Sequence, residues 1–294
     1  MKVLHLDSGR EMRGGQWQVL RLMEGLRREG VDGTLLSRQG SPLLARARAL
    51  GLTARPLGLW TLCRHSRQAD LVHAHDARTH TLAAALATAP LVVSRRVAFP
   101  IQSRWKYARA ERYAAVSQFV KRVMMEGGVP EEKIFVVYDG VPLGEPAPPG
   151  DAVVAPASAD PLKGTALALE ATRLAGVDLL LSRDLESDLA GAALFLYLTR
   201  SEGLGSAILL AMAAGVPVVA SDVGGIPEMI RHQENGWLTE NEPGPIAAAI
   251  GELLADRPLA RRLAEAARQT VAQKFSLDQM IRNTLDLYRQ VLSC

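Results

Sequence analysis

The sequence contains only two cysteines in 294 residues, Cys63 and Cys294. Two thiols cannot form a disulfide framework, and their spacing suits no zinc site. We therefore expect a protein of a reducing, cytoplasmic compartment.

Long uninterrupted apolar runs are also absent. The longest, such as AILLAMAAGVPVVA, are broken by Gly and Pro before the roughly 18 to 20 residues that a membrane span needs. The first ten residues carry charges at Lys2 and Asp7, which leaves no room for a secretory apolar segment, so they are expected to form a first strand. These features predict a soluble protein or one that binds a membrane peripherally.

Neither a GxGxxG fingerprint nor a Walker loop is present, which argues against a dinucleotide-dependent dehydrogenase and a P-loop NTPase. The net charge is only +3, but residues 1–150 hold 22 basic and 13 acidic side chains, and the remainder holds 12 basic and 18 acidic ones. The first half is therefore basic, at +9, and the second acidic, at −6. A basic half suits phosphates, an anionic membrane or an anionic acceptor, and it equally suits an ordinary Arg-rich solvated surface.

In both halves, short apolar runs alternate with longer helical patterns. Strands bounded by turns and separated by helices indicate parallel sheets covered on both faces. The stretch VPLGEPAPPGD at 141–151 holds four prolines and two glycines and is typical of a linker. The predicted fold class is α/β, with two doubly wound, Rossmann-like domains facing each other across a cleft.

Two glycine-containing turns precede predicted helices. Gly14 and Gly15 lie where free backbone N–H groups and the helix dipole favour an anion, although an ordinary turn explains them too. The same arrangement recurs in SEGLGSAILLAMAAG. There, Glu202 projects toward the turn and can accept hydrogen bonds from sugar hydroxyls, or it serves only as a partner for the helix dipole. The backbone that approaches a diphosphate in this interpretation belongs to Gly203, Gly205, Ser206 and Ala207.

Blocks with a specific order and spacing run through nearly the whole chain: RGGQWQVLRLMEGLRREG, DLVHAHDARTHTLAA, AVSQFVKRVMMEGGVPEEKIFVVYDGV, DPLKG, SEGLGSAILLAMAAGVPVVASDVGGIPEMI, ENGWL and LYRQVL. Together they resemble the family-four retaining glycosyltransferases of the GT-B fold. The resemblance implies transfer of a sugar from a nucleotide-diphosphate sugar to a glycan, lipid-linked or small-molecule acceptor with retention of anomeric configuration. It implies no metal and no cofactor besides this co-substrate.

The resemblance also implies a division of the chain. Residues 1–145 are expected to form the acceptor domain, residues 146–274 the donor domain, and residues 275–294 a helix that returns to the first domain. The second domain is about one strand–helix unit shorter than usual, because little sequence separates DPLKG from SEGLG.

Residue roles follow by position in the resembling blocks. Lys163, in DPLKG, matches the lysine that neutralises the donor diphosphate, and Glu202 matches the first glutamate of the family's glutamate pair, which contacts the donor sugar. Gly14 and Gly15 match the glycine loop against donor phosphate and acceptor. The backbone that touches the diphosphate matches Gly205, Ser206 and Ala207.

The sequence departs from the family pattern at several site positions. Ser158 stands where an arginine is usual, and Leu210 stands at the second glutamate. Arg96 replaces a histidine, and Arg96 or its neighbour Arg95 is expected to supply catalytic charge. Asp139 replaces the asparagine of an Asn-Gly-Val motif. Two interpretations are open: a variant transferase with a rearranged donor site, or a catalytically impaired nucleotide-sugar binding or scaffold protein. A sugar-nucleotide epimerase is disfavoured, since its acid and base carboxylates are not recognisable.

Two further features lie in the first half. In HAHD, His73, His75 and Asp76 suggest a metal site, but no further ligand is near in sequence, so we predict no metal. His73 is expected to be packed and His75, with Ser158 and Asp139, to line the cleft. Residues 95–122 interleave basic and aromatic side chains, which suits an anionic membrane surface or a solvated helix face; no nucleic acid partner is expected.

Overall fold

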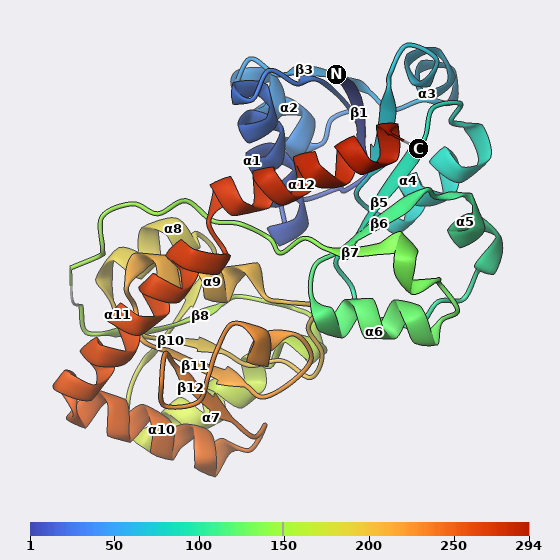
Figure 1. Cartoon of the computed structure of the whole chain (residues 1–294). Coiled ribbons are helices and arrows are strands. Elements are labelled where there is room, and N and C mark those ends of the chain that lie inside the picture. The colour runs from blue at the N-terminus through green and yellow to red at the C-terminus, as the bar shows by residue number, and fades with distance from the viewer. Residues whose placement is uncertain (149, 294) are drawn as a thin grey trace. The chain divides into compact units, whose positions relative to one another are not determined.

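The computed structural model describes residues 1–148 and 150–293. The chain divides into two compact units, one comprising Met1–Gly140 with Leu277–Cys294 and the other Val141–Ser276 (Figure 1). Cys63 is a free thiol, whereas Cys294 lies outside the described residues.

The first unit is built on a seven-stranded parallel sheet in the order β3-β2-β1-β4-β5-β6-β7. The chain starts in the middle of this sheet and reverses direction between β1 and β4, which makes the edge beyond β1 and β4 a topological switch point. The strands are β1 (Lys2–Asp7), β2 (Asp32–Ser37), β3 (Thr53–Pro56), β4 (Leu71–Ala74), β5 (Leu91–Arg95), β6 (Arg112–Ala115) and β7 (Ile134–Val136).

Helices follow the strands of this unit in regular alternation. They are α1 (Gly14–Arg28), α2 (Pro42–Ala49), α3 (Leu59–Ser66), α4 (Ala77–Leu86), α5 (Arg104–Arg109) and α6 (Gln118–Glu126), with a 3₁₀ turn η1 (Glu131–Lys133).

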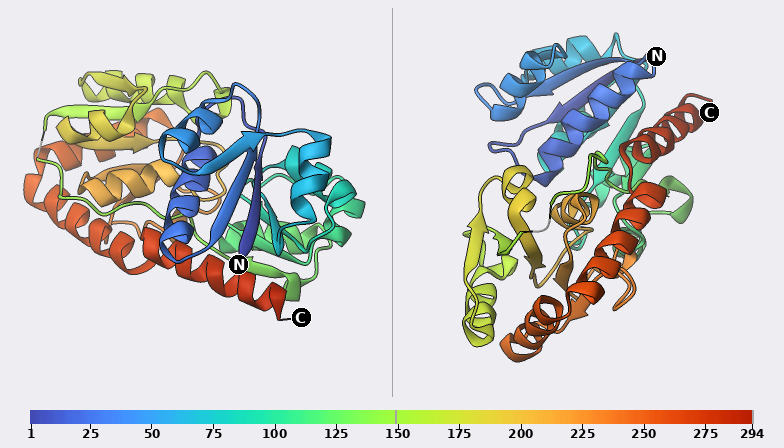
Figure 2. Two further views of the ribbon diagram at one scale, coloured as in Figure 1. Left: turned by 90° about the horizontal axis from the view of Figure 1, so that it is seen from above. Right: turned by 90° about the vertical axis from the view of Figure 1, so that its left-hand side faces the viewer.

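The last helix, α12 (Leu277–Leu292), belongs to the first unit and packs against α1 (Figure 2). Gly25 of α1 permits this close contact, because a Cβ at that position would lie 2.0 Å from Cδ1 of Ile281. Tyr288 of α12 is fully buried in the core that β1 and α1 share with it.

The second unit contains a five-stranded parallel sheet in the order β12-β11-β10-β8-β9, with its switch point between β8 and β10. Its strands are β8 (Ala152–Pro156), β9 (Leu179–Ser182), β10 (Ala192–Tyr197), β11 (Val218–Ser221) and β12 (Trp237–Thr239). Its helices are α7 (Thr165–Ala175), α8 (Leu185–Asp188), α9 (Ser206–Ala214), α10 (Pro243–Ala255) and α11 (Arg257–Lys274), with 3₁₀ turns η2 (Pro161–Lys163), η3 (Leu189–Gly191) and η4 (Ile226–Glu228).

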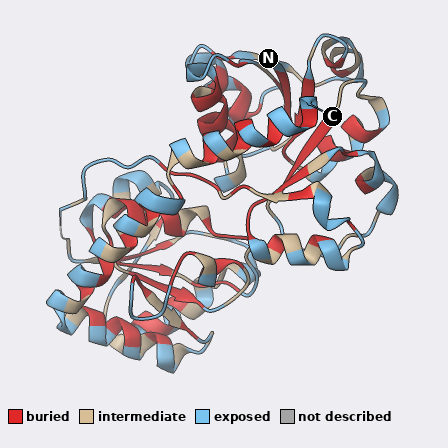
Figure 3. Ribbon diagram, viewed as in Figure 1, coloured by how far each residue is buried: buried red, intermediate tan, exposed pale blue. Residues whose placement is uncertain are grey.

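The central strands of both sheets are buried, whereas helices expose one face (Figure 3). This burial explains why the strands are apolar runs without polar alternation. The predicted fold class, two doubly wound Rossmann-like domains, is confirmed. Among the described residues, no helix combines the length and the apolar character that crossing a bilayer requires.

Candidate functional site

Lys163 and Glu202 meet in the second unit, although 39 residues separate them. Lys163 ends η2, which follows β8, and Glu202 lies between β10 and α9. Because β8 and β10 are neighbours at the switch point, their carboxyl ends bring these two loops together. The Nζ of Lys163 donates a hydrogen bond to Oε2 of Glu202 over 2.6 Å, and the carboxylate is the more buried partner, at 14% exposed.

Tyr197, the last residue of β10, completes this cluster. Its hydroxyl donates to the same Oε2 of Glu202 over 2.5 Å, and the Lys163 ammonium lies 5.8 Å from the centre of its ring. Burial raises the pKa of Tyr197 well above its usual 10, and the negative charge of Glu202 raises it further. The phenol therefore stays a neutral donor. The sequence prediction missed Tyr197, although a hydroxyl at the end of a central strand is a usable signal.

The loop that carries Glu202 is fixed by its backbone. The N–H of Gly203 donates to Oε1 of Glu202 over 3.0 Å, and the N–H of Gly225 donates to the carbonyl of Glu202 over 3.2 Å. Gly224 has a left-handed backbone, with φ of 61°, and a Cβ there would lie 2.1 Å from the Glu202 carbonyl oxygen. A side chain at Gly224 is therefore incompatible with this position of the Glu202 backbone.

Helix α9 begins directly after this loop. Gly205, with φ of 105°, is its N-cap, and no side chain of the described residues caps the helix. The first N–H groups of a helix, here those of Ser206 and Ala207, have no acceptor within the helix and carry its positive dipole end. The structure thus places an ammonium, a carboxylate and a helix N-terminus at one edge of one sheet, an arrangement suited to an anionic ligand with hydroxyl groups.

Ser158 and Leu210, which replace expected site residues, lie in the same unit. The carbonyl of Ser158 accepts a hydrogen bond from the Thr165 hydroxyl over 3.0 Å, and its own hydroxyl accepts from the N–H of Asp160 over 3.2 Å. Ser158 therefore shapes the loop into η2. Leu210 is half-buried on α9, one turn beyond Ser206.

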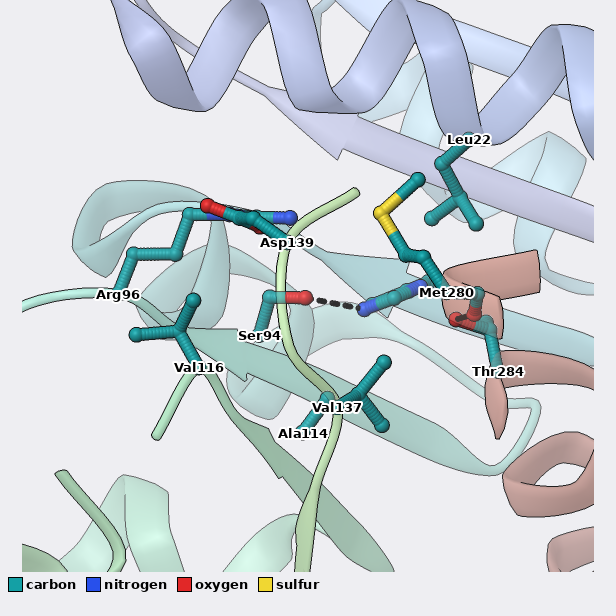
Figure 4. A pocket seen from close by; sticks show the side chains of 10 residues that line it. Leu22, Ser94, Arg96, Ala114, Val116, Val137, Asp139, Met280 and Thr284 are labelled. Atoms are coloured by element: carbon teal, nitrogen blue, oxygen red, sulfur yellow. Dashed lines mark hydrogen bonds and ion pairs between the residues drawn. The ribbon is translucent and has the colours of Figure 1, made fainter. Parts of the chain in front are cut away.

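In the first unit, Arg96 forms an ion pair with Asp139, with 3.0 Å between Nε and Oδ1. Both side chains are largely buried, at 17% and 8% exposed, and Nη1 of Arg96 is buried without a hydrogen-bond partner among the described residues. Figure 4 shows the pair beside a cavity of about 10 Å³, roughly one water in size, that Ser94 also lines. A Cβ on Gly15 would lie 3.9 Å from Cδ of Arg96, so the glycine turn lies next to this cation.

The turn before α1 is held by two side chains that the sequence prediction missed. Asp7, at the end of β1, accepts hydrogen bonds from the N–H of Gly9 over 2.8 Å and from Nε2 of Gln16 over 3.1 Å. The Oε1 of Gln16 in turn accepts from the N–H of Arg13 over 3.3 Å. Gln16 thereby ties the strand end to the start of the helix that Gly14 begins.

Three buried histidines form a second cluster in this unit. Nδ1 of His5 and Nε2 of His75 are 3.0 Å apart, and His73 contacts the hydroxyls of Tyr288 (2.6 Å) and Ser94 (2.8 Å). One nitrogen from each histidine lies within 4.8 Å of the others, the only such group of three potential metal ligands in the described part of the chain. His75, expected to line a cleft, is only 7% exposed.

The contacts of this cluster explain what the sequence did not reveal. His5 joins because it is paired with His73 across the β1–β4 ladder, a contact between residues far apart in sequence. The Asp76 carboxylate instead caps α4 and accepts hydrogen bonds from Ser8. Both nitrogens of His73 already have protein partners, so a bound metal would have to displace one of them.

The histidine cluster predicts a loss of stability in acid. Burial lowers the pKa of His5 to about 3 and those of His73 and His75 well below 6.5. Below about pH 6.5 the unfolded chain binds protons that the folded cluster rejects, at about 1.4 kcal/mol per pH unit for each histidine. Urea unfolding is expected to show a midpoint that falls steadily from pH 7 to pH 5. His5→Asn should flatten this decline, and the exposed His232→Asn should not; equal slopes in all three proteins would contradict the account.

Comparisons with known proteins give the family and the fold of the chain. Residues 12–145 match the family model described as Glycosyltransferase Family 4, and residues 159–270 match the model described as Glycosyl transferases group 1. The structure is similar to the crystal structure of Anabaena Alr3699/HepE in complex with UDP and glucose, with a TM-score of 0.86 and 18% identity over 99% of this chain and 100% of that one.

Relatives in sequence match over shorter segments. N-acetyl-alpha-D-glucosaminyl L-malate synthase of Bacillus anthracis is 37% identical over 105 residues, and alpha-maltose-1-phosphate synthase of Mycobacterium tuberculosis is 38% identical over 110 residues. Each segment covers 35% of this chain and 28% of the relative. Since the two family models together account for most of both units, the chain belongs to family 4 of the glycosyltransferases, the group 1 glycosyl transferases.

Proposed function

We propose that the chain is a glycosyltransferase that takes a sugar from a nucleotide-diphosphate sugar. The observation that carries the proposal is the Lys163–Glu202 pair, 2.6 Å apart, at the carboxyl edge of the five-stranded sheet and directly before α9. The solved structure named above contains UDP, and another of the same protein contains UDP-glucose, so UDP-glucose is the first donor to test.

Each group of the cluster has a role in this proposal. Lys163 and the first N–H groups of α9 bind the diphosphate, whose negative charge grows as the sugar leaves. Glu202 accepts hydrogen bonds from sugar hydroxyls, and Tyr197 holds its carboxylate in place. Because these groups supply the positive charge, the proposed mechanism requires no metal.

Transfer is proposed to occur with retention of configuration. The bond from the anomeric carbon to the diphosphate oxygen breaks, and the acceptor oxygen bonds to the anomeric carbon on the same face. The acceptor proton passes to the departing phosphate oxygen. In this scheme Glu202 orients the sugar and is not the nucleophile.

The basic and aromatic segment 95–122 supports a cytoplasmic enzyme that binds the membrane surface peripherally. Phe99 and Trp105 are 58% and 51% exposed, as an interfacial anchor requires. Arg95, by contrast, donates to the Tyr107 hydroxyl and to the carbonyl of Phe99, so part of the segment serves the fold. Cosedimentation with vesicles containing anionic lipid tests the anchor, which Phe99→Ser should weaken.

A second candidate function is a nucleotide-sugar binding protein without turnover. Ser158 and Leu210 favour it, because neither can supply the cation or the carboxylate expected at its position. Incubation with UDP-, GDP- and ADP-sugars, read as thermal shift and donor hydrolysis, separates the two. Binding with hydrolysis or transfer supports the enzyme, and binding without either, in the presence of candidate acceptors, supports the alternative.

Tyr197→Phe is expected to reduce kcat/KM about 5- to 20-fold without unfolding the protein. The change removes only a hydroxyl and leaves Glu202 with Lys163 and Gly203 as donors. The expected loss is therefore about 1–2 kcal/mol, between the values for a neutral hydrogen bond and for one to a charged group. Steady-state kinetics with the donor identified in the panel measures the effect. Tyr107→Phe, which removes a phenolic hydroxyl in the first unit, is the control. Equal losses of kcat/KM in both variants would contradict the role of Tyr197.

A further inference from the structure

A groove of about 420 Å³ lies at the carboxyl edge of the sheet in the first unit. Its polar lining follows successive strand ends: Ser8 comes after β1, Arg38 and Gln39 come after β2, and Arg78 lies in the first turn of α4 after β4. Since β2, β1 and β4 are neighbours in the sheet, these residues converge on its switch point. The groove has the size of a small-molecule site.

The groove carries positive charge that no neighbouring carboxylate neutralises. Arg38 and Arg78 are exposed, and within the described residues neither guanidinium forms an ion pair or hydrogen bond. The acidic residue nearest to Arg78 in sequence, Asp76, is not paired with its guanidinium in the described structure: the Asp76 carboxylate instead accepts from the backbone N–H groups of Ser8, Arg78 and Thr79. Two unpaired guanidinium groups favour a phosphate or a carboxylate as ligand.

The remaining lining is apolar. Leu62 is fully buried beneath the groove, and Leu82 is half-buried along it. Leu59 is 62% exposed at the start of α3, and the neighbouring Trp60 is 68% exposed, with Arg64 stacked 5.2 Å from the centre of its ring. Large exposed apolar side chains beside a groove favour contact with an apolar portion of a ligand.

We propose that this groove binds the acceptor, and that the acceptor carries an anionic group, a phosphate or carboxylate, next to an apolar portion. Arg38 and Arg78 hold the anion, and Leu59 and Leu82 contact the apolar portion. The assignment as an acceptor site rests on the proposed transferase function, whereas the ligand chemistry rests on the groove alone.

Isothermal titration with three probes tests the ligand chemistry: n-octyl phosphate below its critical micelle concentration, neutral n-octyl glucoside and inorganic phosphate. We expect n-octyl phosphate to bind the protein at least tenfold more tightly than either of the others. Arg38→Gln with Arg78→Gln should weaken its binding at least tenfold. Arg28→Gln with Arg262→Gln, two exposed arginines outside the groove, gives the same change in net charge and should leave binding unchanged.

A second variant separates the apolar contact from the charge. Leu59→Ser should weaken the binding of n-octyl phosphate severalfold and leave the binding of inorganic phosphate unchanged. Because Leu59 is exposed, the fold should tolerate this change. The proposal is overturned if the double arginine variant binds n-octyl phosphate as tightly as the parent does. It is also overturned if n-octyl glucoside or inorganic phosphate binds the parent as tightly as n-octyl phosphate.

The nucleotide serves as an independent readout. UDP-induced thermal stabilisation should be the same in the parent and in the Arg38, Arg78 double variant, because the proposed donor site lies in the second unit. Loss of n-octyl phosphate binding with retained UDP binding supports the groove. If the parent binds n-octyl phosphate through these arginines but binds no nucleotide, the anion site is supported and the transferase proposal is refuted.

Discussion

Replacing Lys163 with alanine is expected to lower turnover by at least 100-fold and to leave the fold intact. Removal of one group that stabilises developing negative charge costs about 10²–10³ in rate in other enzymes, and Lys163 is the only side-chain cation that contacts Glu202 in the described structure. The Lys163 side chain is 36% exposed, so its truncation leaves no cavity in the core. Single-turnover kinetics, with circular dichroism of the variant, measures both expectations.

Lys121→Ala provides the matched control for this experiment. Lys121 forms an ion pair with Glu131 in the first unit, 2.8 Å long, and its side chain is 20% exposed. Its removal breaks a comparable pair away from the proposed donor site and should leave turnover within twofold of the parent. If Lys163→Ala keeps the activity of the parent, Lys163 has no part in the mechanism.

Gly224→Ala is expected to destabilise the second unit and to abolish most activity. The left-handed backbone at Gly224 disfavours any side chain by about 1–3 kcal/mol, and the added Cβ would lie 2.1 Å from the carbonyl oxygen of Glu202. The Glu202 loop must therefore move, and it carries the carboxylate away from Lys163. Thermal unfolding and kcat/KM, measured on the same preparation, report the two effects.

Gly176→Ala separates backbone strain from displacement of the loop. Gly176 has a similar φ of 69°, but a Cβ there would meet nothing within 4 Å. It should lose stability through strain alone and keep its activity. Equal stability losses in the two variants, with activity retained in Gly224→Ala, would show that the close approach of Gly224 to Glu202 does not position the site.

Much of the fold follows from local patterns in the sequence. Buried strands of a parallel sheet are continuous apolar runs, and Gly and Pro mark the turns between them. The alternation of strands and helices can therefore be predicted from local sequence alone. The convergence of Lys163 and Glu202 on one ligand was expected from the resemblance of DPLKG and SEGLG to family blocks. The structure brings the two side chains together because their loops follow β8 and β10, which are neighbours at the switch point.

Other parts of the site depend on contacts that no sequence spacing reveals. His5 joins His73 and His75 only through the register between β1 and β4. The hydroxyl of Tyr197 at the end of an apolar strand marks it as a candidate, but its contact with Glu202, five residues further on, belongs to no motif. Such partners are set by register and side-chain rotamer, which depend on the packed structure and not on local propensity.

The central claim is that Lys163 binds the diphosphate of the donor. Calorimetric titration of UDP and UMP, or of the nucleotide pair that the donor panel identifies, tests it most directly. UMP lacks the second phosphate. The account predicts that Lys163→Ala weakens UDP binding at least tenfold and UMP binding much less, since Lys163 is assigned to the diphosphate. Equal weakening of both nucleotides, or unchanged binding of UDP, would contradict it.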